Sequence, residues 1–235
     1  LRWAQVTNLN SGTARGKSQG NSGFDITYDS NTESAITLTI NQHQYQAFEL
    51  EEFEASLSII DQQMYYTRRA AYGVNLAIDT ALAALPAGFS QTTGTLTIDL
   101  TDDDIRRGVQ YLGDANVPDA DRFLGISPAT KNSMMSIDRY ASADFNRGDG
   151  ANLITGEFKA TYGLRGFEST NIKGSNAAGH DNTMHHRDAI ALGMRMSPRT
   201  RTFDDIQNLS TQVAISAIWG SVEIRDDHGV WMKGS

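Results

Sequence analysis

Residues 51–88 read EEFEASLSIIDQQMYYTRRAAYGVNLAIDTALAALPAG, and the spacing of their apolar side chains decides the fold. Apolar residues recur at steps of three, four or seven, which is the period of an amphipathic helix. The pattern predicts one helix over 51–85, about 45 Å long at 1.5 Å per residue, that ends at Pro86 and Gly88. Its predicted core side chains are Leu57, Ile60, Met64, Val74, Ile78 and Leu82.

A stripe of this length suits either a coiled coil or a helix that lies along a sheet. We expect the second arrangement, which is the more common one. Tyr66, Tyr72 and Asn75 lie off the stripe and indicate a second packed surface on the same helix.

The residues before the helix are polar and extended. WAQV (3–6) and FDITY (24–28) alternate apolar and polar side chains and are predicted strands, and SGTARGKSQGNSG (11–23) between them is a predicted loop. Ile36, Leu38 and Ile40 alternate with threonines in a third strand. Residues 1–50 are therefore expected to form an extended arm or hairpin.

Strands and helices alternate irregularly after the helix. TLTIDL (95–100) is a predicted strand, and Thr101 and Asp104 form a capping-box-like start to the next helix. A strand at 123–126 runs into a helix with Ser127 as N-cap and Pro128 in its first turn. DAIALGMRM (188–196) is a further strand, and a closing strand pair is expected around DDHG (226–229). This order places the chain in the α+β class.

Composition excludes several functions. The 235 residues contain no cysteine, so there is no disulfide, thiol nucleophile or zinc–thiolate cluster. The net charge is −8, and the only dense cationic stretch holds Arg195, Arg199 and Arg201, so sequence-specific nucleic-acid binding is not expected. No apolar run is long enough to suggest a membrane span. The chain begins at Leu1, and we expect that upstream residues have been removed or are not represented.

HDNTMHH (180–186) brings together three of the five histidines, His180, His185 and His186. A catalytic zinc site needs three ligands that converge on one point. Adjacent histidines point to opposite faces of a strand, and they diverge by about 100° on a helix. The spacing also matches no helix-borne metal motif. We therefore expect a polar loop leading into the strand 188–196, and no metal site.

No other motif points to chemistry. The acidic runs TDDD (101–104) and RDD (225–227) and the segment GDGAN (148–152) lack the ligand order of a calcium loop, and helix caps and solvated turns explain them better. The RGD tripeptide at 147–149 is too short to indicate adhesion. No nucleophile elbow, P-loop or dinucleotide fingerprint is present. We expect neither an enzyme nor a cofactor.

The order of these segments resembles the major capsid proteins of tailed bacteriophages, which have the Hong Kong 97 fold. Three places carry the likeness: the strand that enters a Ser-Pro helix start at 123–128, the glycine-flanked segment 156–171, and the apolar-Trp-Gly step at 218–220 that leads into 222–232. The resemblance spans roughly residues 35–235. Each motif is weak alone, and their order and spacing carry the weight.

The resemblance implies a role for each segment. Residues 1–50 would be the extended arm and E-loop hairpin, 51–94 the P-domain spine helix and turn, 95–187 the axial A-domain, and 188–235 a return to the P-domain sheet. It also implies E-loop contacts to a neighbouring subunit through Arg15, Lys17, Phe24 and Tyr28.

The implied function is a capsid protein that assembles into hexamers and pentamers of an icosahedral shell around double-stranded DNA. Its partners would be copies of itself, together with portal, scaffolding and decoration proteins, and its contact with packaged DNA would be non-specific. No membrane is implied, and the protein would lie in the virion after assembly in the host cytoplasm.

Two other classes of function stay open. One is a virion decoration or adhesion domain whose polar loops meet a ligand. The other is a metal hydrolase that uses the histidine cluster. Particle size separates a shell from both alternatives, and a metal assay addresses the hydrolase.

Overall fold

The computed structural model describes residues 2–6, 33–58, 60–137, 162–175 and 177–235. The chain divides into two units, Leu1–Thr39 and Ile40–Ser235. In the first unit, β1 (Arg2–Val6) pairs antiparallel with β2 (Glu33–Thr37). This pairing joins the two ends of the segment 7–32, as a hairpin would. The FDITY strand predicted at 24–28 lies outside the described residues.

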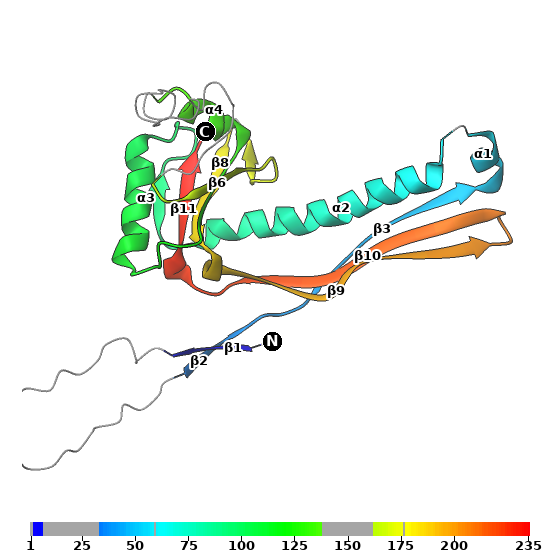
Figure 1. Cartoon of the computed structure of the whole chain (residues 1–235), viewed down its shortest axis with the longest axis horizontal. Helices are drawn as coiled ribbons and strands as arrows, with labels where there is room; N and C mark the ends of the chain where they lie inside the picture. The colour runs from blue at the N-terminus through cyan, green and yellow to red at the C-terminus, as the bar shows by residue number, and fades with distance from the viewer. Residues whose placement is uncertain (1, 7–32, 59, 138–161, 176) are drawn as a thin grey trace, which may run out of the picture. The chain divides into compact units, whose positions relative to one another are not determined.

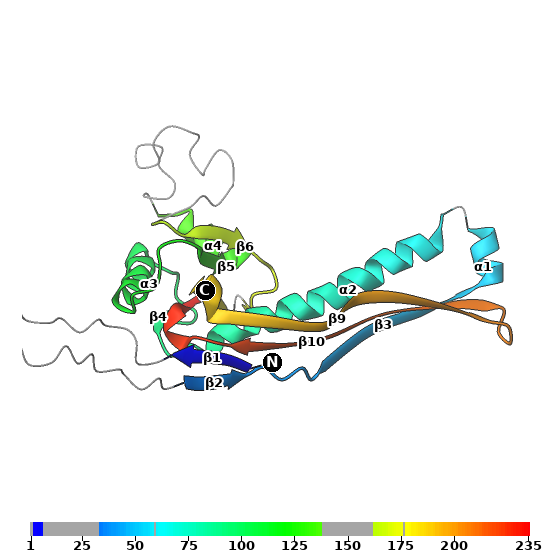
Figure 2. The ribbon, with the colours of Figure 1, turned by 60° about the horizontal axis from the view of Figure 1, so that its bottom comes forward.

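The second unit contains two sheets (Figures 1 and 2). The three-stranded sheet has the order β3-β10-β9, and the six-stranded sheet has the order β4-β11-β8-β5-β6 with β7 beside β8. The strands of the first are β3 (Gln42–Glu51), β9 (Ile190–Asp205) and β10 (Ser210–Glu223). Those of the second are β4 (Thr92–Gly94), β5 (Arg122–Ile126), β6 (Arg165–Glu168), β7 (Gly174–Ser175), β8 (Gly179–His186) and β11 (Gly229–Gly234).

The helical stretch that opened the sequence forms two helices. They are α1 (Glu52–Leu57) and α2 (Gln62–Ala84), and the 3-10 turn η1 (Leu85–Gly88) ends the second. The single helix predicted over 51–85 is wrong because polar side chains bind the backbone between the two. Ser58 Oγ accepts a hydrogen bond from Ile60 N at 3.2 Å, and the Asp61 carboxylate accepts one from Met64 N at 3.0 Å as the N-cap of α2.

α2 lies along the three-stranded sheet (Figures 1 and 2). Ala70, Val74 and Ile78 are its buried residues. They pack against alternate side chains of β10, with Leu82 and Phe48 partly buried at the margin; the β10 residues are Ile215, Ala217 and Trp219. The helix therefore covers one face of this sheet.

Three of the predicted core residues do not belong to this core. Leu57 is 70% exposed and Ile60 69%, and Met64 is exposed as well. Leu57 lies on α1 and Ile60 lies between the two helices, while Met64 lies in the first turn of α2, before the buried stripe that starts at Ala70. The apolar period therefore continues in the sequence but not on one surface.

The six-stranded sheet holds the larger core. Its inward side chains come from alternate residues of β5, β8 and β11. They pack against α3 (Asp102–Asp114) and α4 (Pro128–Met134), both of which start at the predicted caps. Thr101 and Asp104 form the capping box, and Ser127 Oγ accepts from Thr130 N at 3.1 Å. The cluster consists of Leu100, Ile105, Leu112, Val117, Leu124, Ile126, Met134, Leu164, Met184, Val230 and Met232.

Several predicted boundaries differ from the structure. TLTIDL (95–100) forms turns, and the strand lies earlier, at 92–94. β3 pairs with β10, so residues 42–50 belong to the three-stranded sheet and not to the arm. β10 and β11 do not form the closing pair: β10 lies between β3 and β9, whereas β11 joins β8 and β4.

Candidate functional site

The histidine stretch forms β8, an inner strand of the six-stranded sheet. All of its residues except His185 are buried, so the predicted polar loop is wrong. Partners distant in sequence satisfy two of its polar side chains: Asn182 Oδ1 accepts from Ser127 N at 2.8 Å, and the Asp181 carboxylate accepts from Trp231 Nε1 at 3.0 Å. The strand is therefore part of the framework of the sheet.

The strand separates its histidines. Alternate side chains of a strand lie on opposite faces, so His185 faces away from His180 and His186. The latter two are six residues apart on one face, about 20 Å at 3.3 Å per residue. Within the described ranges, no group of three or more His, Cys, Asp or Glu side chains could hold a metal ion. The metal-hydrolase alternative gains no support from this geometry.

His185 lines a cavity of about 580 Å³ between the outer face of the six-stranded sheet, the end of α2 and the start of β9. Its ring lies 5.9 Å from that of Phe123, and its Nδ1 is 3.2 Å from Thr183 Oγ1. Burial, and secondarily the charge of His186, lowers the pKa of His185 to about 4. The imidazole is thus neutral near pH 7 and packs as an aromatic side chain.

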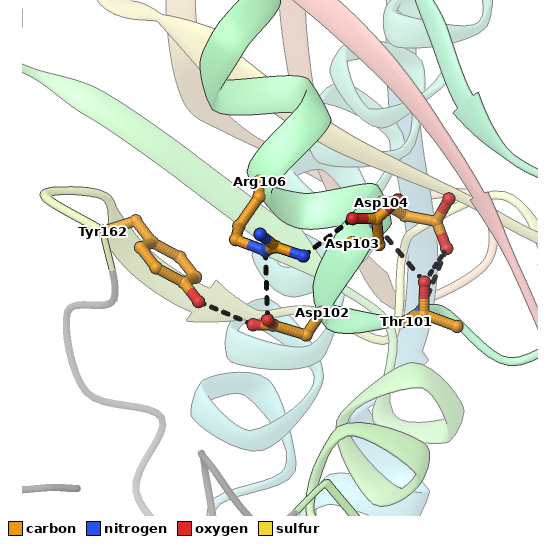
Figure 3. Close-up of polar contacts among 6 residues, drawn as sticks. All are labelled: Thr101, Asp102, Asp103, Asp104, Arg106 and Tyr162. Atoms are coloured by element: carbon orange, nitrogen blue, oxygen red, sulfur yellow. Dashed lines mark hydrogen bonds and ion pairs between the residues drawn. The ribbon is translucent and has the colours of Figure 1, made fainter.

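The acidic run TDDD at the start of α3 stabilises the helix (Figure 3). Asp104 Oδ2 accepts from Thr101 N at 3.0 Å, and the Arg106 guanidinium lies 3.2 Å from Asp102 and 2.7 Å from Asp103. Tyr162 donates its hydroxyl proton to Asp102 Oδ1 at 2.7 Å. The prediction that this run caps the helix is confirmed. Asp102 also binds the side chain of Tyr162, the first described residue after residue 137.

The second acidic run, RDD (225–227), joins two segments that are distant in the sequence. Asp226 accepts hydrogen bonds from Ser90 N at 2.8 Å and from the Ser90 hydroxyl, which joins segments 136 residues apart. Burial alone would raise the pKa of Asp226, but the hydrogen bonds from Ser90 lower it below its usual value. Burial, together with the charge of Asp226, raises the pKa of Glu223.

Large apolar side chains are exposed where α1 meets the turn between β9 and β10. Phe53 is 72% exposed and Ile206 86%, and Leu57 and Leu209 are also exposed. Glu52 N donates to Leu209 O at 3.0 Å, so helix and turn are joined. Monomeric soluble proteins seldom leave such side chains grouped in water, and this surface, the apolar tip, is typical of a protein contact.

The outer face of α2 is also uncovered. Tyr65 and Tyr72 are exposed there, and Arg68 and Arg69 make no ion pair with any other residue in the described part of the chain. Sequence analysis placed Tyr72 off the core stripe but did not identify this group. The signal was the pair of tyrosines seven residues apart with two arginines between them.

By length and composition alone, Gln62–Gly88 is apolar enough to cross a membrane, which sequence analysis missed. Only 22% of the tested window is buried. A helix that lays one stripe on a sheet passes the same test, and α2 does so through Val74 and Ile78. The composition of this helix is therefore weak support for a membrane span. It also reflects that much of the surface of α2 is not covered by the sheet.

Some predicted sites cannot be placed. Arg15, Lys17, Phe24 and Tyr28, assigned to neighbour contacts, lie outside the described residues, as do RGD (147–149) and GDGAN (148–152). The cationic stretch is described: Arg195, Arg199 and Arg201 lie on β9 and are exposed.

No protein-family model and no curated protein matches the sequence. Solved structures do match, over almost the whole chain. A structure of Mycobacterium phage Che8 has a TM-score of 0.78 at 21% identity, covering 99% of this chain and 83% of that one. The capsid structure of cyanophage P-SCSP1u has a TM-score of 0.78 at 14% identity, covering 100% and 83%. The head structure of Helicobacter pylori bacteriophage KHP40 has a TM-score of 0.78 at 10% identity, covering 100% and 84%.

This chain thus has the fold of phage capsid structures. The predicted α+β class and Hong Kong 97-like fold are confirmed.

Proposed function

We propose that this protein is the major capsid protein of a tailed bacteriophage, which assembles from copies of itself into an icosahedral shell around double-stranded DNA. The observation that carries the proposal is the match of 99–100% of the chain to phage capsid and head structures. A decoration or adhesion domain would need only part of such a fold, whereas here the match covers almost the whole chain and more than four fifths of each capsid chain.

The surface of the chain supports the same proposal. The apolar tip and the outer face of α2 expose Phe53, Leu57, Tyr65 and Tyr72. Covering such side chains with neighbouring copies removes apolar area from water, and this is the main driving force of protein association. An isolated subunit would instead carry them as an aggregation hazard.

In this proposal the first unit and each of the two sheets of the second unit have a role. The β1–β2 pair with the segment between them acts as the E-loop hairpin. α2 and the three-stranded sheet act as the P-domain, and the six-stranded sheet with α3 and α4 acts as the A-domain. A two-stranded hairpin is at best marginally stable alone in water, so the hairpin would gain order by lying on a neighbour.

The net charge of −8 suits a container for DNA, since an acidic wall does not hold the packaged polymer by its phosphates. The proposal therefore includes no specific DNA site and no catalytic role. Hexamers and pentamers, a portal, scaffolding or decoration partners, and assembly in the host cytoplasm belong to the same proposal.

The test is the mass and shape of the purified protein. The purified protein should give closed particles of megadalton mass in sedimentation and negative-stain electron microscopy. A decoration or adhesion domain would give small oligomers. A monodisperse small oligomer under all assembly conditions, including polyethylene glycol and high salt, would contradict the proposal.

A further inference from the structure

The outer face of α2 carries an open groove of about 610 Å³ next to β3. Its lining combines two exposed tyrosines with two exposed arginines that have no ion-pair partner among the described residues. Tyr and Arg are enriched among the residues that dominate binding energy at protein interfaces. We call this surface the Tyr–Arg groove; it is lined by Gln46, Tyr65, Arg68, Arg69, Tyr72 and Gly73.

A surface of the opposite charge lies a short distance earlier in the chain. Residues 51–57, the acidic lobe, comprise Glu51 and α1, with three glutamates and no lysine or arginine. The glutamates Glu51, Glu52 and Glu54 are exposed, and none makes an ion pair with another described residue. Between them the lobe exposes Phe53 and Leu57. The lobe thus matches the groove in charge and in apolar character.

The lobe and the groove do not bind each other within one chain. The Ser58 and Asp61 side chains accept hydrogen bonds from backbone amides between the two helices, and α1 does not continue the line of α2 (Figure 1). No ion pair or side-chain hydrogen bond joins Glu52 or Glu54 to Arg68 or Arg69 where the chain is described. Among the residues that the structure describes, neither surface therefore has its complement in the chain that carries it.

We propose that the acidic lobe of one copy docks in the Tyr–Arg groove of a second copy. The glutamates pair with Arg68 and Arg69, while Phe53 and Leu57 cover the tyrosine rings. We choose a second copy as the partner because this chain itself presents the matching surface. The proposal rests on the proposed function in one respect, namely that copies of this chain bind each other.

In the proposed arrangement the contact is heterologous: a copy that accepts a lobe offers its own lobe to a third copy and not back to the first. Contacts of this kind continue around a ring or along an open array and do not stop at a dimer. This is the type of contact that a shell needs between successive subunits. A polyanion such as DNA is the other class of ligand with the charge for the groove, and the test below separates the two.

A charge swap tests the contact. Reversing the groove (R68E with R69E) or the lobe (E52R with E54R) should each lower the yield of assembled particles about tenfold or more, because like charges then face each other across the interface. The four changes combined in one chain should restore the yield, since the pairs are re-formed in reverse. Failure of the combined variant to recover, with circular dichroism unchanged, would overturn the proposal.

Engineered cysteines give a second readout that does not depend on a shell, because the chain has no cysteine of its own. Ser56→Cys places a thiol at an exposed position within the lobe, and Asn75→Cys places one at an exposed position of α2, three residues after Tyr72 of the groove. The double variant should form a ladder of disulfide-linked oligomers on mild oxidation. Each single variant should not, and the R199E/R201E change on β9 should leave the ladder intact.

The outcomes separate this inference from the proposed function. A ladder without closed particles supports the lobe–groove contact and contradicts the shell. Closed particles without a ladder support the shell and overturn the contact. Binding of duplex DNA that is lost in the R68E/R69E variant and not regained in the combined variant would assign the groove to the polyanion and overturn the contact.

Discussion

The two sheets of the second unit differ in how completely their apolar side chains are buried. The six-stranded sheet is packed by α3 and α4 around eleven buried apolar residues, and the buried Asn182 side chain has hydrogen-bond partners. The three-stranded sheet has one helix on one face, a core of six residues, and exposed apolar side chains at its far end. The first region is stable by its own contacts. In the proposed shell, the second forms half of an interface, and contacts with other copies add to its stability.

The largest effects on stability are expected when core side chains of the two sheets are truncated. Leu124→Ala in the six-stranded sheet and Ile78→Ala in α2 should each lower the free energy of unfolding by about 2–5 kcal/mol. Leu124 should lie toward the upper end because it is enclosed within the larger core. Urea unfolding of free subunits gives both values.

Leu57→Ala is the matched control for this pair. Its side chain is 70% exposed, so its effect should stay within about half a kcal/mol. Equal losses for Leu57 and Ile78 would mean that α1 is packed in the free subunit and that the contrast between the regions is wrong.

Acid should act on the six-stranded sheet through His185. Its pKa is about 4 in the fold and near 6.5 when unfolded, so the unfolded chain binds more protons between these values. The free energy of unfolding should therefore fall as the pH drops from 6.5 to 4, by up to about 3 kcal/mol from this group. Urea midpoints across that range, for wild type and His185→Phe, test the assignment.

The variant should lose this part of the pH dependence, because phenylalanine keeps the contact with Phe123 but does not titrate. Carboxylates contribute to acid unfolding in both proteins, so the difference between the two slopes is the relevant quantity. Identical slopes would show that His185 is protonated at its ordinary pKa in the fold.

Helix caps give a smaller test of the same comparison. Thr101→Ala removes the cap of α3 and should cost about 1 kcal/mol, and Asp61→Ala should cost a similar amount at the start of α2. Thermal unfolding of free subunits measures both. Because α2 is uncovered on its outer face, the Asp61 variant should also fray first in hydrogen exchange. Fraying of α3 before α2 would reverse the proposed order of local stability.

These caps also show how far sequence reasoning reached. Thr101 with Asp104, and Ser127 with Pro128, were recognised because capping depends on residues a few positions apart. The end of the helix close to Pro86 was predicted for the same reason, and α2 ends at Ala84 with Pro86 in the 3-10 turn that follows. The general order of elements and the α+β class also followed from local patterns, whereas the Hong Kong 97-like fold followed from the resemblance of that order to phage capsid proteins.

The failures have two physical causes. β8 looked like a polar loop because the partners of Asp181 and Asn182, among them Ser127 and Trp231, lie about 50 residues away. The break between α1 and α2 was missed because two side chains, Ser58 and Asp61, redirect the backbone while the apolar period continues. Exposure of the tip was not predictable, because the same apolar stripe serves a core or an interface.

The smallest expected effect on stability belongs to the tip. Phe53→Ser should change the urea midpoint of the free subunit little, since the side chain is 72% exposed. The same change should reduce particle yield, because a polar side chain cannot replace the apolar contact with a neighbour. A large loss of subunit stability with normal assembly would contradict the distinction between the well-packed six-stranded sheet and the partly uncovered three-stranded sheet with α1 and α2.

Hydrogen exchange of free subunits beside assembled particles tests this division most directly. The account predicts that protection of β5, β8 and β11 is already high in the subunit and changes little. Amides of α1, the outer turns of α2 and the β9–β10 turn should gain protection on assembly. A gain confined to the six-stranded sheet, with α1 and α2 unchanged, would contradict the account.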